Sequence, residues 1–220
     1  MAASRPIEEL VASTQARVLA NFVGRIQQRR ILDVGTGNGR AALVLAHGGA
    51  DVTAIDPSPE MLAAASERAA TGSVRIRFRT GDAHALDFAD RAFDVAVALG
   101  LLDELGDWQQ GLSELCRVAE RLVIVDYPSS RTRALLGGNM TSGNGAQRGL
   151  TDRSVAEAFV RAGFRVRSVH RQFVLPRALH EAIGSRRFTV LVEGFLESIG
   201  VNKVIGSPVT LVAERTLITR

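Results

Sequence analysis

The chain has 220 residues, 46% of them hydrophobic and 23% charged, and this balance predicts one ordinary globular domain. It contains no apolar run long enough to span a bilayer and no secretory signal at its start, which excludes a transmembrane helix and favours a cytoplasmic location. The net charge is +4, but no block of like charges occurs, so the sequence does not indicate a nucleic-acid surface. Cys116 is the single cysteine, so the sequence indicates neither an internal disulfide nor a metal framework.

The first half of the chain alternates between helical and β-rich segments. An amphipathic helix is expected over residues 6–27, where apolar residues recur at three- and four-residue steps. After it, the pattern predicts strands at 31–34, 52–55, 74–78, 93–98 and 122–125, with helices at 40–47, 59–70 and 107–120. This rhythm predicts a parallel sheet with helices on both faces.

The second half departs from that rhythm. Residues 129–150 are rich in glycine, serine, asparagine and arginine, and a loop of this length predicts a lid or a disordered connection. A capped helix and two strands follow, the helix from Thr151 or Asp152 to Ala162 and the strands at 164–175 and 207–217. Between these strands, residues 176–202 contain an apolar helical stripe that could pack as core, line a substrate pocket or rest on a membrane surface. We interpret residues 1–220 as one domain that begins with a helical segment over residues 1–30.

The strand at 31–34 ends in a turn with glycine at three alternate positions, Gly35, Gly37 and Gly39, and a helix follows the turn. Glycine lets the main chain turn sharply and lets a ligand approach the backbone. The carboxyl end of a strand is also where open α/β sheets bind ligands. A dinucleotide loop of the G-x-G-x-x-G type would place its last glycine where Arg40 stands. The turn therefore predicts a nucleotide-type binding loop of another kind.

Carboxylates follow the second and third strands. Asp56 ends the second strand, where it can accept hydrogen bonds from both hydroxyls of a ribose, although dinucleotide enzymes share this spacing. A polar turn, Gly81-Asp82-Ala83, follows the third strand. Together with the glycine turn, these positions predict one ligand site built from the loops after the first three strands.

Asp33 precedes the first glycine by two positions, and the resulting acidic-x-G-x-G-x-G pattern resembles the loop of class I S-adenosylmethionine-dependent methyltransferases. The resemblance covers about residues 31–127. It implies a Rossmann-like, doubly wound α/β fold, with a mostly parallel seven-stranded sheet, an antiparallel last strand and helices on both faces. It also implies S-adenosylmethionine as cofactor, S-adenosylhomocysteine as product, and a set of cofactor-binding residues: Asp33, Gly35, Thr36, Gly37, Gly39, Asp56, Pro57, Asp82, Ala83 and Leu99.

The resemblance also implies individual roles for these residues. Asp33 would orient the glycine loop or the amino group of the cofactor, and Asp56 would bind the ribose hydroxyls. Asp82 would accept a hydrogen bond from the adenine amino group, while the Ala83 N–H would meet a ring nitrogen. The loop from Leu99 would border the methyl-donating sulfur.

The function expected from these features is methylation of a small apolar or amphipathic metabolite. The loop after the fourth strand lacks the Asn/Asp-Pro-Pro-aromatic motif of enzymes that methylate nucleic-acid bases, which argues against a nucleic-acid partner. An RNA or protein methyltransferase and a non-catalytic cofactor-binding protein remain alternatives, whereas Arg40 and the Asp82 turn disfavour an NAD-dependent oxidoreductase. The sequence carries no indication of the oligomeric state.

A general base is needed only if the acceptor must lose a proton before it reacts. The candidates for that role, or for contact with the acceptor, are Tyr127, Asp126 and His84, followed by Asp103, Glu104 and His170. No residue is expected to bind a metal ion.

Overall fold

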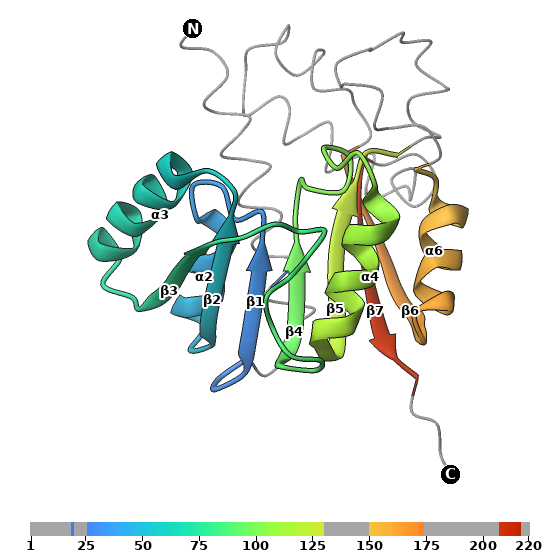
Figure 1. The fold of residues 1–220 in the computed structure, drawn as a ribbon, viewed down its shortest axis with the longest axis horizontal. Coiled ribbons are helices and arrows are strands. Elements are labelled where there is room, and N and C mark those ends of the chain that lie inside the picture. The colour runs from blue at the N-terminus through green and yellow to red at the C-terminus, as the bar shows by residue number, and fades with distance from the viewer. Residues whose placement is uncertain (1–18, 20–25, 130–149, 174–206, 217–220) are drawn as a thin grey trace, which may run out of the picture.

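The computed structural model describes residues 19, 26–129, 150–173 and 207–216 (Figure 1). Most of the predicted N-terminal helix at 6–27, most of the predicted lid at 129–150 and all of the predicted insertion at 176–202 lie outside the described residues. No helix in the described part is long and apolar enough to cross a membrane.

Seven strands form one sheet in the order β3-β2-β1-β4-β5-β7-β6. The strands are β1 (Arg30–Val34), β2 (Asp51–Asp56), β3 (Ile76–Thr80), β4 (Phe93–Ala98), β5 (Ala119–Tyr127), β6 (Phe164–Phe173) and β7 (Ser207–Arg215). β1 to β5 pair in parallel, while β7 lies antiparallel between β5 and β6. The predicted fold, with its reversed last strand, is confirmed.

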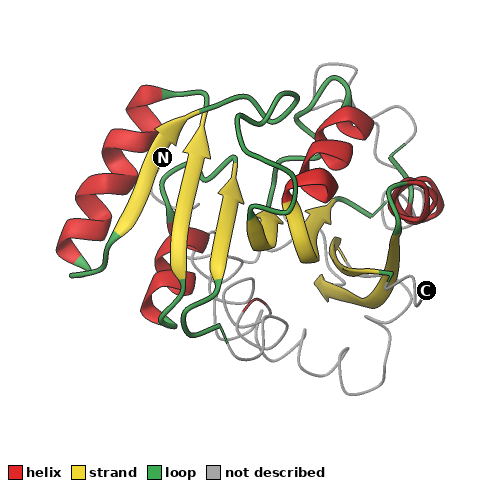
Figure 2. Ribbon diagram, turned by 60° about the horizontal axis from the view of Figure 1, so that its bottom comes forward, coloured by secondary structure: helices red, strands yellow, loops and turns green. Residues whose placement is uncertain are grey.

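Helices cover both faces of the sheet (Figure 2). The described helices are α2 (Arg40–His47), α3 (Pro59–Thr71), α4 (Trp108–Val118) and α6 (Asp152–Arg161). Because successive strand residues point to opposite faces, the strands supply two separate cores. One core contains Leu32, Ala96 and Val123 together with apolar residues of α4 and α6. The other contains Ile31, Val95 and Ile124 together with apolar residues of α2.

Most predicted elements are confirmed within a few residues, and α3 and α6 begin behind the side-chain caps Ser58 and Thr151. The predicted helix to Glu120 is wrong, because α4 ends at Val118 and Ala119 already pairs with Phe93 in the sheet. The guanidinium of Arg215 donates hydrogen bonds to the carbonyl oxygen of Cys116, near the end of α4, and to those of Ala119 and Glu120, at the start of β5.

Candidate cofactor site

The turn between β1 and α2 is built on three left-handed residues, Gly35, Gly37 and Gly39, with φ angles of 68°, 52° and 80°. Glycine adopts this conformation without the steric cost that other residues carry. The N–H groups of Gly35 and Thr36 both donate to the carbonyl oxygen of Ile55, at 2.9 and 3.0 Å. The turn is therefore fastened to β2, at the upper edge of the sheet in Figure 1, where the parallel strands end.

The three glycines face different surroundings. A Cβ atom at Gly35 would lie 2.8 Å from Leu101 Cδ1, and one at Gly39 would lie 2.8 Å from the Cβ of Ala65 in α3. A Cβ at Gly37 would have no described atom within 4 Å. Gly35 and Gly39 thus allow close packing within the protein, whereas Gly37 faces open space that a ligand can use. The sequence pattern alone did not separate these roles.

Asp33 lies behind the turn and is buried. Its Oδ2 accepts a hydrogen bond from the Thr36 hydroxyl at 2.7 Å. Burial raises the pKa of the Asp33 carboxyl from 3.8 to about 6, although the hydrogen bonds from Thr36 and from the Ala42 backbone lower it. The hydrogen bond from Thr36 links the Asp33 side chain to the glycine turn.

Asp56 joins the first two loops of the site. Its Oδ2 accepts the Gly37 N–H at 2.8 Å and its Oδ1 accepts the Ser58 N–H at 2.9 Å. A carboxylate oxygen can accept more than one hydrogen bond, so both oxygens keep capacity for ligand hydroxyls. Pro57, next in the chain, is exposed.

Asp82 extends from the loop after β3, and its side chain is 67% exposed. Its Oδ1 accepts the backbone N–H of His84 at 2.8 Å and lies 3.0 Å from His84 Nδ1. The hydrogen bond from the His84 backbone is the main reason that the pKa of Asp82 lies below its usual value. Ala83 is buried beside it. The Asp82 carboxylate is thus held in place, ionised and open to a ligand, and His84 belongs to this turn.

The loop after β3 is held along α4 by a stripe of polar residues that the sequence analysis missed. Gln110 Nε2 donates to the carbonyl oxygen of His84 at 3.1 Å, and Glu114 Oε2 accepts the N–H of Leu86 at 2.8 Å. Arg117 donates to the carbonyl oxygens of Leu86 and Phe88, at 2.8 and 2.7 Å. The spacing of Gln110, Glu114 and Arg117, four and then three residues, was the available signal, because it places them on one helix face.

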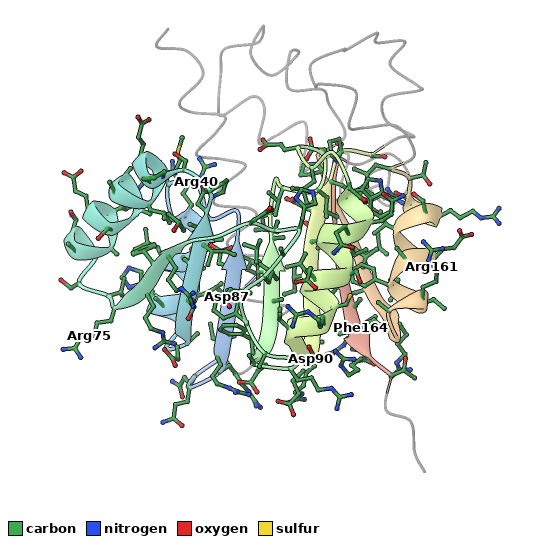
Figure 3. All side chains as sticks on the ribbon, viewed as in Figure 1. Arg40, Arg75, Asp87, Asp90, Arg161 and Phe164 are labelled. Carbon is green, nitrogen blue, oxygen red and sulfur yellow. The ribbon has the colours of Figure 1, made fainter. Side chains whose placement is uncertain are left out.

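Arg117 also pairs with Glu114 at 2.7 Å and with Asp90 at 2.9 Å. Figure 3 shows Asp87 and Asp90 along this loop, while Arg40, the residue that departs from the dinucleotide pattern, lies exposed at the start of α2. The hydrogen bonds to Glu114 and Asp90 raise the pKa of the guanidinium, which therefore stays charged.

The loop after β4 borders the same edge of the sheet. Gly100, at a φ of 69°, donates its N–H to the buried carboxylate of Asp126. Leu99 and Leu101 are half-buried, and Leu101 packs against Gly35. Burial raises the pKa of Glu104, followed by the charges of Asp103 and Asp56. The effect of Asp56 indicates that Glu104 lies near the same loops.

Asp126 and Tyr127 are neighbours at the end of β5 and point to opposite faces of the sheet. Asp126 holds the loop after β4 through Gly100. Tyr127 is buried, and its hydroxyl donates to Asp152 Oδ1 at 3.3 Å. Burial raises the pKa of the Tyr127 phenol, followed by the charge of Asp152. The structure therefore separates these two candidates from each other and from His84.

Comparisons with known proteins find similar sequences and a shared fold. Residues 31–121 match the family model described as a methyltransferase domain. The chain is 42% identical to the demethylmenaquinone methyltransferase of Thermus thermophilus over 106 residues, which cover 46% of this chain and 48% of that protein. It is 38% identical to the ubiquinone biosynthesis O-methyltransferase of Azorhizobium caulinodans over 78 residues, or 36% of this chain and 31% of that protein.

Solved structures share the fold. The magnesium protoporphyrin IX methyltransferase of Synechocystis, solved with bound SAH, superposes with a TM-score of 0.68 at 18% identity, covering 95% of this chain and 84% of that one. The chain spans about half the length of the first curated relatives that it matches. Residues 31–121 are thus similar to the methyltransferase-domain family, and the fold is shared with a solved methyltransferase.

Proposed function

We propose that this chain transfers a methyl group from S-adenosylmethionine to a small apolar or amphipathic metabolite. The observation that carries the proposal is the joint geometry of three loops at one edge of the sheet. Gly37 presents open backbone, Asp56 accepts the N–H groups of Gly37 and Ser58 with its two carboxylate oxygens, and Asp82 presents an exposed carboxylate. These features lie in the part of the chain that matches the methyltransferase family.

The residues present fit the proposed cofactor. The open space at Gly37 suits the amino-acid tail of the cofactor, because no atom of the described residues lies within 4 Å of a Cβ at this position. The remaining acceptor capacity of Asp56 suits the two ribose hydroxyls, and Asp82 suits the adenine amino group. Asp33 supports the turn from behind through Thr36. Thr36, Pro57, Ala83 and Leu99 complete the proposed set as neighbours of these contacts.

When bound, S-adenosylmethionine supplies a methyl group that the positive charge on sulfur has already activated. The residues of the chain therefore need to hold the acceptor in line with that methyl group and to exclude water. Positioning of this kind contributes roughly 7–11 kcal/mol to rate enhancement in favourable cases. We assign no general base among Tyr127, Asp126 and His84, since each already has a partner that explains its position.

The acceptor side of the proposed site supports an apolar substrate. Leu99 and Leu101 are half-buried on the loop after β4, beside the glycine turn. Two relatives carry names that refer to quinones or their precursors, demethylmenaquinone and ubiquinone. We therefore propose a quinone-type or phenolic acceptor as the first class to test.

Calorimetry with S-adenosylhomocysteine and NAD tests the cofactor assignment. We expect binding of S-adenosylhomocysteine and none of NAD. Asp56→Ala removes hydrogen bonds to a charged group, and the loss of one such bond costs about 1.5–3 kcal/mol, so affinity should fall at least roughly tenfold. Glu157→Ala is the matched control, because Glu157 pairs with Arg153 on the exposed surface of α6. Binding of NAD, or unchanged binding by Asp56→Ala, would refute the cofactor assignment.

Transfer of a labelled methyl group to reduced 1,4-naphthoquinone and to 4-hydroxybenzoate tests the reaction. Turnover that requires Asp56 and tolerates Glu157→Ala supports the proposal. A protein that binds S-adenosylhomocysteine and yields no labelled product with any metabolite pool is instead a cofactor-binding protein.

A further inference from the structure

A second polar cluster consists of Tyr127, Asp152 and Arg171. It lies near the carboxyl ends of the parallel strands, the end of the sheet that also carries the cofactor loops. Tyr127 of β5 pairs with Val209 of β7, and Val209 pairs with Arg171 of β6. Residues directly opposite each other on neighbouring strands point to the same face. Since β5 and β6 both run antiparallel to β7, Tyr127 and Arg171 lie near the carboxyl ends of their strands, on the face covered by α4 and α6.

Asp152, the first residue of α6, holds both side chains of this cluster. Its Oδ2 accepts a hydrogen bond from Arg171 Nη2 at 2.6 Å, and its Oδ1 accepts one from the Tyr127 hydroxyl at 3.3 Å. The Arg171 side chain is only 10% exposed. One guanidinium and one carboxylate thus form a neutral pair that fixes the orientation of the guanidinium.

Arg171 nevertheless keeps one donor unused. Its Nη1 is buried and has no hydrogen-bond partner. Among the described side chains, Trp108 Nε1 is the only other buried polar atom without one. Trp108 begins α4 and belongs to the same core as Tyr127. Because native proteins pair nearly all buried polar atoms, a buried N–H of a charged group without a partner calls for an oxygen atom from elsewhere.

We propose that Arg171, positioned by Asp152 and Tyr127, binds a carbonyl or phenolic oxygen of the methyl acceptor. This inference rests on the proposed function, since it assigns a contact to the proposed methyl acceptor. The neutral Arg171–Asp152 pair favours a neutral or phenolic oxygen over a phosphate, because a fully charged anion would meet no uncompensated positive charge in the pair. The acceptor class is therefore a ring that carries a hydroxyl or carbonyl group.

Equilibrium dialysis of the full chain with S-adenosylhomocysteine tests this site, using 1-naphthol and naphthalene as probes. The two probes share one ring system and differ in a single oxygen. We expect the wild type to bind 1-naphthol about tenfold or more tightly than naphthalene, as a hydrogen bond to a charged donor provides. Arg171→Met should reduce this preference to about one, while binding of naphthalene stays unchanged.

Arg167→Met is the matched control, because Arg167 lies on the same strand with its side chain 58% exposed. It should keep the wild-type preference. A purely structural role of Arg171 would weaken both probes equally and leave their ratio unchanged, which would overturn the inference. If Arg171→Met does not fold, Arg171→Lys keeps a positive charge near Asp152 and should still lose the preference, because it lacks the second planar donor.

The titration with S-adenosylhomocysteine alone, made first, separates the two proposals. A protein that does not bind it refutes the proposed function. A protein that binds it and shows no preference for 1-naphthol refutes only the role of Arg171.

Discussion

Replacing Gly37 or Gly39 with alanine is expected to separate cofactor binding from folding at the turn between β1 and α2. Both residues have a positive φ, and alanine in that conformation costs roughly 1–2 kcal/mol. At Gly37 this is the whole expected loss of stability, because the new methyl group would meet open space. At Gly39 the methyl group would lie 2.8 Å from the Cβ of Ala65, and overpacking of this kind adds about 1–3 kcal/mol.

The assay measures both quantities for each variant. Urea denaturation gives the free energy of unfolding, which should fall by about 1–2 kcal/mol for Gly37→Ala and by about 2–5 kcal/mol for Gly39→Ala. Calorimetry gives the affinity for S-adenosylhomocysteine, which should fall about tenfold or more for Gly37→Ala because the methyl group occupies the ligand's space. Wild-type affinity in Gly37→Ala would show that the ligand lies elsewhere. Equal stability losses would refute the packing argument for Gly39.

Three further outcomes follow from buried or paired groups. Burial raises the pKa of Asp33 from 3.8 to about 6. Between about pH 4 and pH 6, the folded state therefore keeps a proton on Asp33 that the unfolded state has lost. Urea denaturation should therefore show the wild type gaining up to about 3 kcal/mol relative to Asp33→Asn as pH falls from about 6 to 4, and losing it as pH rises. Arg117→Met removes hydrogen bonds that hold the loop after β3, which carries Asp82. Calorimetry should therefore show weaker binding of S-adenosylhomocysteine. The preference for this ligand over S-inosylhomocysteine, which lacks the adenine amino group, should also become smaller. Burial raises the pKa of the Cys116 thiol to about 12, so a disulfide reagent should label it only when the protein unfolds.

Local patterns predicted the elements well where local interactions decide them. The bounds of α2 and β4 match the sequence prediction, since each is set by its own periodicity and flanking residues. The predicted end of α4 was wrong because Ala119 pairs with Phe93 in the sheet, a contact that the tertiary structure decides. No pattern near Glu120 reveals such a contact.

The candidate site shows the same division. The positions of Asp33, Asp56 and Asp82 at the ends of three strands followed from the sequence. The different surroundings of Gly37 and Gly39 did not, because they depend on where α3 packs. The opposite directions of Asp126 and Tyr127 could have been predicted from strand alternation, because they are consecutive strand residues.

The contact between Leu101 and Gly35 limits how this protein can change its substrate. Leu101 lies on the loop beside the proposed acceptor, and its Cδ1 comes within 2.8 Å of where a Gly35 side chain would begin. A larger residue at position 101 would press on the turn that binds the cofactor. Selection for new acceptors should therefore keep Leu101 and replace Leu99. Recognition of the acceptor could then change while binding of the cofactor is preserved.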